Sequence, residues 1–211
     1  LCEKSDVILV LAPSNPENHL GYPGEVLQYG KNTYIDKTFA PDYKTAERIF
    51  AIATQYGTKF FSSSALRYGT ELCEVKDAVK VATKGGGSNL PEYIVHQAEM
   101  VVKTLGFGAK SVCTERLGDN HYLCKIGYAD GRSASMEYRA DYPFAIDWES
   151  ADGKKGNAEI VSDMFVYLIE SILKFYESGE LPFDSAQTLE VMKIREAAVK
   201  GLNQIGKTIS L

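Results

Sequence analysis

Three short apolar segments, separated by helical patterns, most constrain how the first third of the chain can fold. Val7 to Ala12 is a continuous apolar run, which is typical of a strand covered on both faces. Further strands are predicted at 33–35 and 59–63, and Asp42 is placed to cap the helix between them. Strands that alternate with helices in this way indicate a parallel sheet with right-handed crossovers.

The pattern changes after Arg67. Helices are predicted at 70–78 and 91–106, followed by a run of strands and then by two long amphipathic helices at 159–178 and 185–204. The predicted strands lie at 79–83, 110–115, 121–128, 132–139 and 144–148. This order predicts an α+β domain whose sheet is largely antiparallel, open on one face and flanked by helices.

Charge and composition exclude several classes of function. The chain has 211 residues, of which 45% are hydrophobic, and a net charge of -5. Nucleic acids and anionic membranes require clusters of basic residues, so neither is expected as a partner. The longest apolar run is far shorter than the ~20 residues that span a bilayer. Four widely spaced cysteines form no C-x-x-C pair and favour reduced thiols in a cytoplasmic protein.

A lysine at the end of a predicted strand is the first candidate for chemistry. Lys37 follows the strand at 33–35, and the carboxyl ends of parallel strands form the edge where such sheets bind ligands. There it could donate hydrogen bonds to a hydroxyl or carbonyl group. The alternative is an ordinary solvated surface lysine.

Glu92 and His96 lie four residues apart and therefore project from one face of the predicted helix at 91–106. A carboxylate beside an imidazole can hold its tautomer and raise its basicity, which suits proton transfer. Taken alone, the pair is more simply a surface ion pair. A metal site would need at least one further ligand, so no metal is predicted.

Two polar segments leave their roles open. Ser62 to Ser64, with Arg67 and Tyr68, could line a sugar or polyol pocket, or could simply form a loop. The run Gly85 to Gly87 lacks the spacing and the strand-to-helix context of a phosphate-binding loop.

With these residues placed, the chain resembles the Gfo/Idh/MocA family of nicotinamide-dependent oxidoreductases. In that family a strand like the segment 6–13 leads to a helix with a histidine, here His19, and the next strand ends in Glu-Lys-Pro, here Asp36-Lys37-Thr38. Arg67-Tyr68 matches an arginine–aromatic pair, and Glu92 to His96 matches an Asp-x-x-x-His pattern. The resemblance covers essentially the whole chain.

The resemblance implies a fold and a domain division. Residues 1–67 would form the C-terminal part of a Rossmann-type, dinucleotide-binding sheet, and residues 68–211 a substrate-binding and dimerisation domain. It also implies a homodimer or tetramer that associates through the open face of the C-terminal sheet.

The implied function is an NAD(P)-dependent oxidoreductase acting on a sugar, polyol or related hydroxy compound. Lys37 would hydrogen-bond the reacting oxygen, His96 would exchange its proton, and Glu92 would orient His96. Arg67 and Tyr68 would line the substrate pocket. The residues near the cofactor would be Ala12, Pro13, His19 and Asp36.

The sequence departs from the family pattern in three places. Thr38 replaces the proline, so the cis peptide bond of the family is not expected. Glu92 replaces aspartate, which lengthens the reach of the carboxylate. The glycine-rich phosphate loop that opens the family's fold is missing from the chain, so we expect weak binding of NAD or NADP. A non-catalytic ligand-binding or dimerisation module of the same fold is therefore the alternative.

Overall fold

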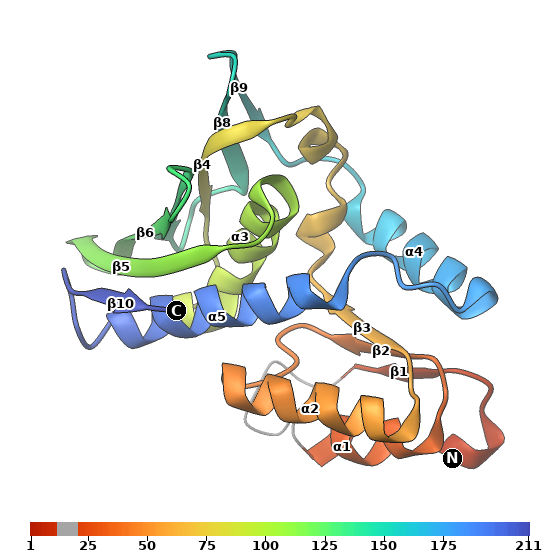
Figure 1. Ribbon diagram of the computed structural model, residues 1–211. Coiled ribbons are helices and arrows are strands. Elements are labelled where there is room, and N and C mark those ends of the chain that lie inside the picture. Colours follow the sequence, from red (N-terminus) through yellow and green to blue (C-terminus); the bar gives the residue numbers. More distant parts are fainter. Residues whose placement is uncertain (12–20) are drawn as a thin grey trace.

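The computed structural model describes residues 1–11 and 21–211 and shows two sheets with helices packed against each (Figure 1). The smaller sheet is parallel and is built from β1 (Ile8–Val10), β2 (Thr33–Asp36) and β3 (Phe60–Ser63), in that order. The predicted parallel arrangement of the three apolar segments is therefore confirmed.

Helices α1 (Gly21–Val26) and α2 (Tyr43–Tyr56) belong to this smaller sheet. A 3-10 helix over Leu27–Tyr29 continues α1. The cap predicted for α2 is present, since the Asp42 carboxylate accepts a hydrogen bond from the Thr45 N–H at 2.7 Å. Gly57 ends α2 with a φ of 65°, which glycine adopts without steric cost.

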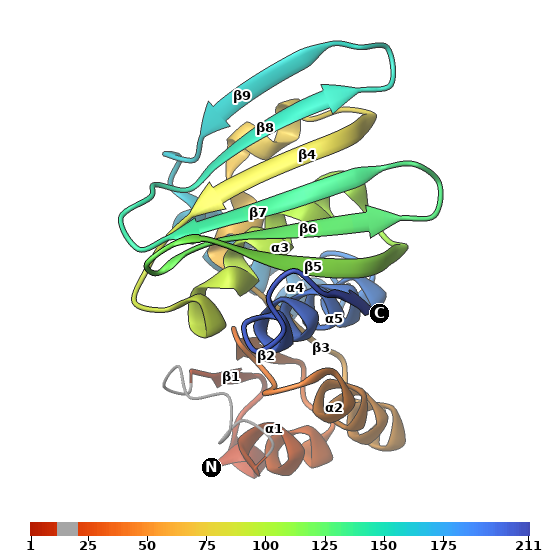
Figure 2. The ribbon, with the colours of Figure 1, turned by 90° about the vertical axis from the view of Figure 1, so that its left-hand side faces the viewer.

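The larger sheet has seven strands in the order β10-β5-β6-β7-β4-β8-β9 (Figure 2). Its strands are β4 (Ala78–Gly85), β5 (Ala109–Gly118), β6 (His121–Tyr128), β7 (Ser133–Arg139), β8 (Ala145–Ser150), β9 (Lys155–Glu159) and β10 (Thr208–Ser210). All neighbouring strands are antiparallel except β4 and β7, which are parallel. The predicted, largely antiparallel sheet is confirmed.

Helices α3 (Leu90–Leu105) and α5 (Ser185–Gly201) cover one face of the larger sheet and leave the other open (Figure 2). The main core lies between them and the sheet. It includes Ile94, Val101, Val112, Met136 and Ile194, which are all essentially inaccessible to solvent. Apolar residues at helical spacing on α3 meet alternate residues of the strands, so burial fixes which face of each strand is covered.

The smaller sheet is covered on both faces, by α2 on one side and by α4 (Met164–Ser178) on the other (Figure 1). Alternate residues of β2 show this division, because Tyr34 packs with α4 and Ile35 packs with α2. Helix α5 ties the two sheets together: the Thr188 hydroxyl donates to the Ser62 carbonyl oxygen of β3 at 3.3 Å.

The sequence missed several boundaries in the second half. Residues 70–78 form a 3-10 helix only over Thr70–Glu74. There the Glu71 carboxylate accepts hydrogen bonds from the backbone of Val161 and Ser162. The helix predicted from residue 159 begins at Met164, because 155–159 pairs with β8 as strand β9. Strand β10 was not predicted.

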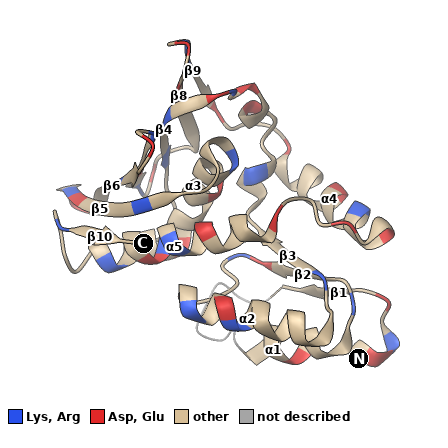
Figure 3. Cartoon of the chain, viewed as in Figure 1, with Lys and Arg blue, Asp and Glu red and all other residues tan. Residues whose placement is uncertain are grey.

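Acidic and basic side chains are interspersed along α2, α4 and β5 (Figure 3). Within the described ranges, no helix combines the length and the apolar character needed to cross a membrane.

Candidate active site

Polar residues follow β2 and β3 at the carboxyl edge of the parallel sheet. Asp36 ends β2 and lies opposite Ser63, the last residue of β3, so the two strands end at the same level. Lys37 follows the first strand and Ser64 follows the second. This edge is where open parallel sheets bind ligands.

The peptide bond between Lys37 and Thr38 is cis. Our expectation that the cis bond would be lost with the proline is therefore wrong. The Thr38 side chain is buried at 5% exposure, so the turn after β2 is packed against the protein.

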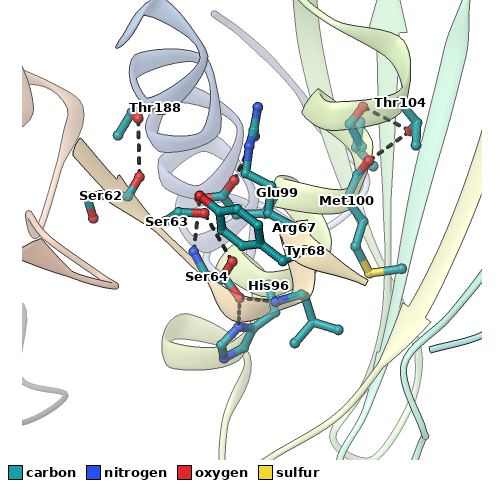
Figure 4. Close-up of polar contacts among 12 residues, drawn as sticks. Ser62, Ser63, Ser64, Arg67, Tyr68, His96, Glu99, Met100, Thr104 and Thr188 are labelled. Atoms are coloured by element: carbon teal, nitrogen blue, oxygen red, sulfur yellow. Dashed lines mark hydrogen bonds and ion pairs between the residues drawn. The ribbon is translucent and has the colours of Figure 1, made fainter. Parts of the chain in front are cut away.

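Helix α3 brings His96 to the end of β3. The His96 Nδ1 atom lies 2.5 Å from the Oγ atom of Ser64, a fully buried residue (Figure 4). The Ser64 Oγ atom also accepts a hydrogen bond from the Leu66 N–H at 3.2 Å. The 3-10 helix over Ala65–Tyr68 thus fixes the hydroxyl that contacts the imidazole.

A buried ion pair lies one helical turn away from this contact. Arg67 Nη1 donates to Glu99 Oε2 at 2.9 Å, and Glu99 Oε1 accepts from the Ser64 N–H at 3.2 Å (Figure 4). The Arg67 guanidinium group lies 3.9 Å from the centre of the Phe183 ring. Three contacts, Ser64 with His96 and both Ser64 and Arg67 with Glu99, therefore join the segment after β3 to α3.

His96 is buried, and the charge of Lys37 acts on it. Burial is the larger cause and the positive charge of Lys37 the smaller one, and together they lower the pKa of His96 to about 3. The imidazole is therefore neutral near pH 7. The structure brings together these two residues, which the sequence placed on separate elements.

Two aromatic rings flank the imidazole. The centres of the Tyr93 and Phe144 rings each lie 5.5 Å from the centre of the His96 ring. A Cβ atom on Gly85 would lie 2.2 Å from Phe144, and one on Gly87 would lie 2.1 Å from Tyr93. The glycine run therefore makes room for the aromatic rings beside His96.

The same glycine run does not fit the phosphates of a dinucleotide. A Cβ atom on Gly86 would lie 2.2 Å from the carbonyl oxygen of Arg139, and the Gly87 N–H donates to the Ala140 carbonyl oxygen at 3.1 Å. Protein backbone thus occupies the space that a phosphate would need.

Several solved structures have the same architecture as this chain. A scyllo-inositol dehydrogenase from Lactobacillus casei aligns with 98% of this chain and 79% of its own, at a TM-score of 0.76 and 13% identity. A proposed myo-inositol dehydrogenase from Sinorhizobium meliloti aligns with 99% of this chain and 83% of its own, at a TM-score of 0.79 and 15% identity. The chain has the Gfo/Idh/MocA dehydrogenase fold. The fold resemblance stated from the sequence is confirmed.

A further structure with the Gfo/Idh/MocA fold is a UDP-N-acetylglucosamine 3-dehydrogenase from Acidithiobacillus ferrooxidans. It aligns with 97% of this chain and 80% of its own, at a TM-score of 0.74 and 10% identity. No protein-family profile and no curated protein matches the sequence. The relationship is therefore visible in the fold and not in sequence identity.

Within this fold, Glu92 does not occupy the place predicted for it. Its carboxylate accepts a hydrogen bond from the Ser88 hydroxyl at 3.3 Å, and its N–H donates to Asn89 Oδ1 at 2.9 Å. The His96 Nδ1 atom contacts Ser64, and the orientation of His96 by Glu92 stays a prediction. Glu92 instead belongs to the first turn of α3, where an acidic residue is favoured.

The two predicted pocket residues after β3 point to other parts of the fold. Arg67 is only 5% exposed and is engaged with Glu99, so its side chain holds the site together and is not available to line a pocket. Tyr68 accepts a hydrogen bond from the Ser171 hydroxyl of α4 at 3.1 Å and lines a hollow of about 400 Å³ over α4. Burial raises the pKa of Tyr68 to about 12, so its phenol stays protonated.

The predicted cofactor-binding residues are described only in part. Asp36 lies at the end of β2, where its Oδ1 atom accepts a hydrogen bond from the Tyr34 hydroxyl at 3.3 Å. Ala12, Pro13 and His19 lie outside the described residues, so their placement near a cofactor stays a prediction.

Sequence reasoning missed three residues of this site. Ser64 was named only as part of a polar run, Phe144 only as the start of a strand, and Glu99 was given no role. One signal was available: Ser64 and Arg67, like His96 and Glu99, are three residues apart and can face one neighbour. The pairing between the two sets depends on the docking of α3 and could not be read from spacing.

Proposed function

We propose that the chain is part of an NAD(P)-dependent oxidoreductase that acts on a sugar, polyol or related hydroxy compound. The observation that supports the proposal is the position of Lys37 at the carboxyl edge of a parallel sheet in the Gfo/Idh/MocA fold, from where its charge acts on His96. The neighbours described as inositol and sugar-nucleotide dehydrogenases favour a polyhydroxylated substrate.

The residues beside this edge support such a substrate. A lysine ammonium group donates hydrogen bonds to a hydroxyl or carbonyl oxygen. The rings of Tyr93 and Phe144 flank His96 and offer apolar surfaces beside these polar groups. A sugar or cyclic polyol combines the two features that this surface matches, oxygens on its rim and C–H groups on its faces.

In this proposal the chemistry of hydride transfer is supplied by the nicotinamide, and the protein orients the substrate. Binding of the dinucleotide requires a glycine-rich turn between a strand and a helix, which is not found among the described residues. We therefore expect NADH and NADPH to bind this 211-residue chain weakly, as a fluorescence titration would show.

The proposal is tested by replacing Lys37 in the full-length gene product. Lys37→Ala should lower turnover of a polyol substrate by roughly a hundredfold or more, because a group that stabilises charge at the reacting oxygen is lost. The matched control is Lys44→Ala, which removes an exposed lysine of α2 and should leave turnover unchanged. Near-normal turnover of the Lys37 variant would refute the assignment.

A non-catalytic module of the same fold is the second candidate. The observation that favours it is the packed glycine run, which leaves no phosphate site in that part of the fold. Binding of a polyol by the full-length product, with no oxidation or reduction in the presence of either nucleotide, would favour this candidate.

We further propose that copies of the chain associate through the open face of the larger sheet. A hollow of about 630 Å³ lies there, between β4, β6, β7, β8 and β9. The open face carries small residues, such as Ala82 and Ser135, among charged ones, such as Lys80 and Glu149. An interface between subunits, taken as a whole, is about as polar as the rest of a protein surface, so this composition is compatible with one.

A further inference from the structure

The contact between Ser64 and His96 determines which nitrogen of the imidazole carries the proton. A neutral imidazole has one N–H donor and one acceptor nitrogen, and the partner of each nitrogen fixes the tautomer. The Ser64 hydroxyl has one proton and is fully buried, so water does not compete for it. Where that proton goes therefore decides the state of His96.

The hydrogen bonds around Ser64 leave one acceptor for its proton. Its Oγ atom already accepts from the Leu66 N–H, and the other short contact of the hydroxyl in the described chain is with His96 Nδ1 at 2.5 Å. If Nδ1 carried a proton, the Ser64 hydroxyl would be buried without an acceptor, which is unfavourable. Donation from Ser64 to an unprotonated Nδ1 satisfies both groups.

We propose that Ser64 is a positioning residue that holds His96 as the neutral tautomer protonated on Nε2, so that His96 presents a hydrogen-bond donor to the ligand. Ser64 is held in turn by Glu99, which accepts its N–H, and by Arg67, which pairs with Glu99. The hydroxyl is therefore fixed by the backbone and by a buried ion pair, and it does not turn freely.

This tautomer changes the role that His96 would have in the proposed oxidoreductase. This part of the inference rests on the proposed function. An Nε2–H group cannot accept a proton from a substrate hydroxyl, but it can donate to an oxygen on which negative charge develops. Together with the Lys37 cation, whose charge acts on His96, this group would give a ligand oxygen two hydrogen-bond donors. The site thus favours a ligand oxygen with free lone pairs, such as a ketone or aldehyde oxygen.

The test is a long-range ¹H–¹⁵N correlation spectrum of the histidine rings of this chain at pH 7, without nucleotide or substrate. His96→Gln identifies the signals of His96. The two ring nitrogens of His96 should show the separate shifts of a single tautomer, with the protonated nitrogen at Nε2. A protonated Nδ1 would overturn the proposal, and this readout needs no variant of Ser64.

Two serine variants then test whether Ser64 is the cause. In Ser64→Ala the two nitrogen shifts should move toward each other, because the tautomers interconvert once the donor is gone. Ser63→Ala is the matched control: Ser63 is equally buried, but its hydroxyl donates to the Ser64 carbonyl oxygen and does not contact His96. Unchanged shifts in Ser64→Ala would refute the role of Ser64.

The spectrum separates this inference from the proposed function. If the full-length product has no redox activity while His96 is protonated on Nε2, the proposed function fails and the tautomer assignment stands. If the product is active and Nδ1 is protonated, the proposed function stands and the tautomer assignment fails.

Discussion

At the scale of single residues, His96 shows how burial changes an ordinary side chain. Its pKa falls to about 3, mainly because burial disfavours the charged imidazolium and also because Lys37 is close. A group of this kind cannot serve as a general base near neutral pH with useful strength, since an effective base has a pKa near the working pH. The sequence predicted that Glu92 would orient His96, and the structure shows a further neighbour, Ser64, at the Nδ1 atom of the ring.

The lowered pKa also predicts a dependence of stability on pH. Between about pH 6.5 and about pH 3 the unfolded chain binds a proton at His96 and the folded chain does not, so the free energy of unfolding falls as the pH is lowered. We expect His96→Gln to reduce this slope by up to ~1.4 kcal/mol per pH unit.

Urea unfolding of the parent chain and of His96→Gln, at about pH 8, 6 and 4.5, measures this difference. At about pH 8 the imidazole is neutral in both the folded and the unfolded chain, so this end of the series provides the reference. Parallel slopes for the two proteins would contradict the prediction.

At the scale of elements, the contacts of Arg67 and Glu99 dock α3 onto the segment after β3. Both side chains are almost fully buried, at 6% and 4% exposure. Removal of one partner of a buried pair leaves an uncompensated charge and costs about 3–5 kcal/mol. We therefore expect Arg67→Met to lower the free energy of unfolding by this amount, as measured by urea denaturation.

Two further variants, each compared with Arg67→Met, test this prediction more closely. The double variant Arg67→Met/Glu99→Leu should be more stable than Arg67→Met alone, because no charge remains buried. Lys80→Ala breaks an exposed pair, in which the Lys80 side chain is 61% accessible, and should cost less than ~1 kcal/mol. Equal effects of Arg67→Met and Lys80→Ala would show that the buried pair does not hold the elements together.

At the scale of the whole molecule, the open face of the larger sheet should be where copies of the chain meet. Ala82 lies in the middle of this face, opposite Ser135 on one side and Asp147 on the other. Ala82→Arg should shift the protein toward monomer, because a long charged side chain would project into the interface. Light scattering across a concentration series measures the change.

The matched control is Gln55→Arg, which adds the same charge at an exposed position of α2. It should leave the association state as in the parent chain. A parent chain that is monomeric at all concentrations would refute the proposed interface.

Local sequence patterns were sufficient to predict the parallel order of the first three strands, the cap of α2 and the antiparallel sheet that follows. These features depend on local patterns: alternating strands and helices, Asp42 before a helix, and Asp130-Gly131 between two strands. Burial requirements and hydrogen bonds among near neighbours fix such features, so they can be predicted from the order of the residues along the chain.

The composition of the site, in contrast, depends on contacts between residues that are far apart in the sequence. His96 lies 32 positions from Ser64 along the chain, and the same separation joins Arg67 to Glu99. These contacts exist because α3 packs on its sheet with one particular rotation, which is set by its apolar face. Glu92, although one turn from His96 on the same helix, is thereby directed to Ser88, and a buried serine takes its expected place.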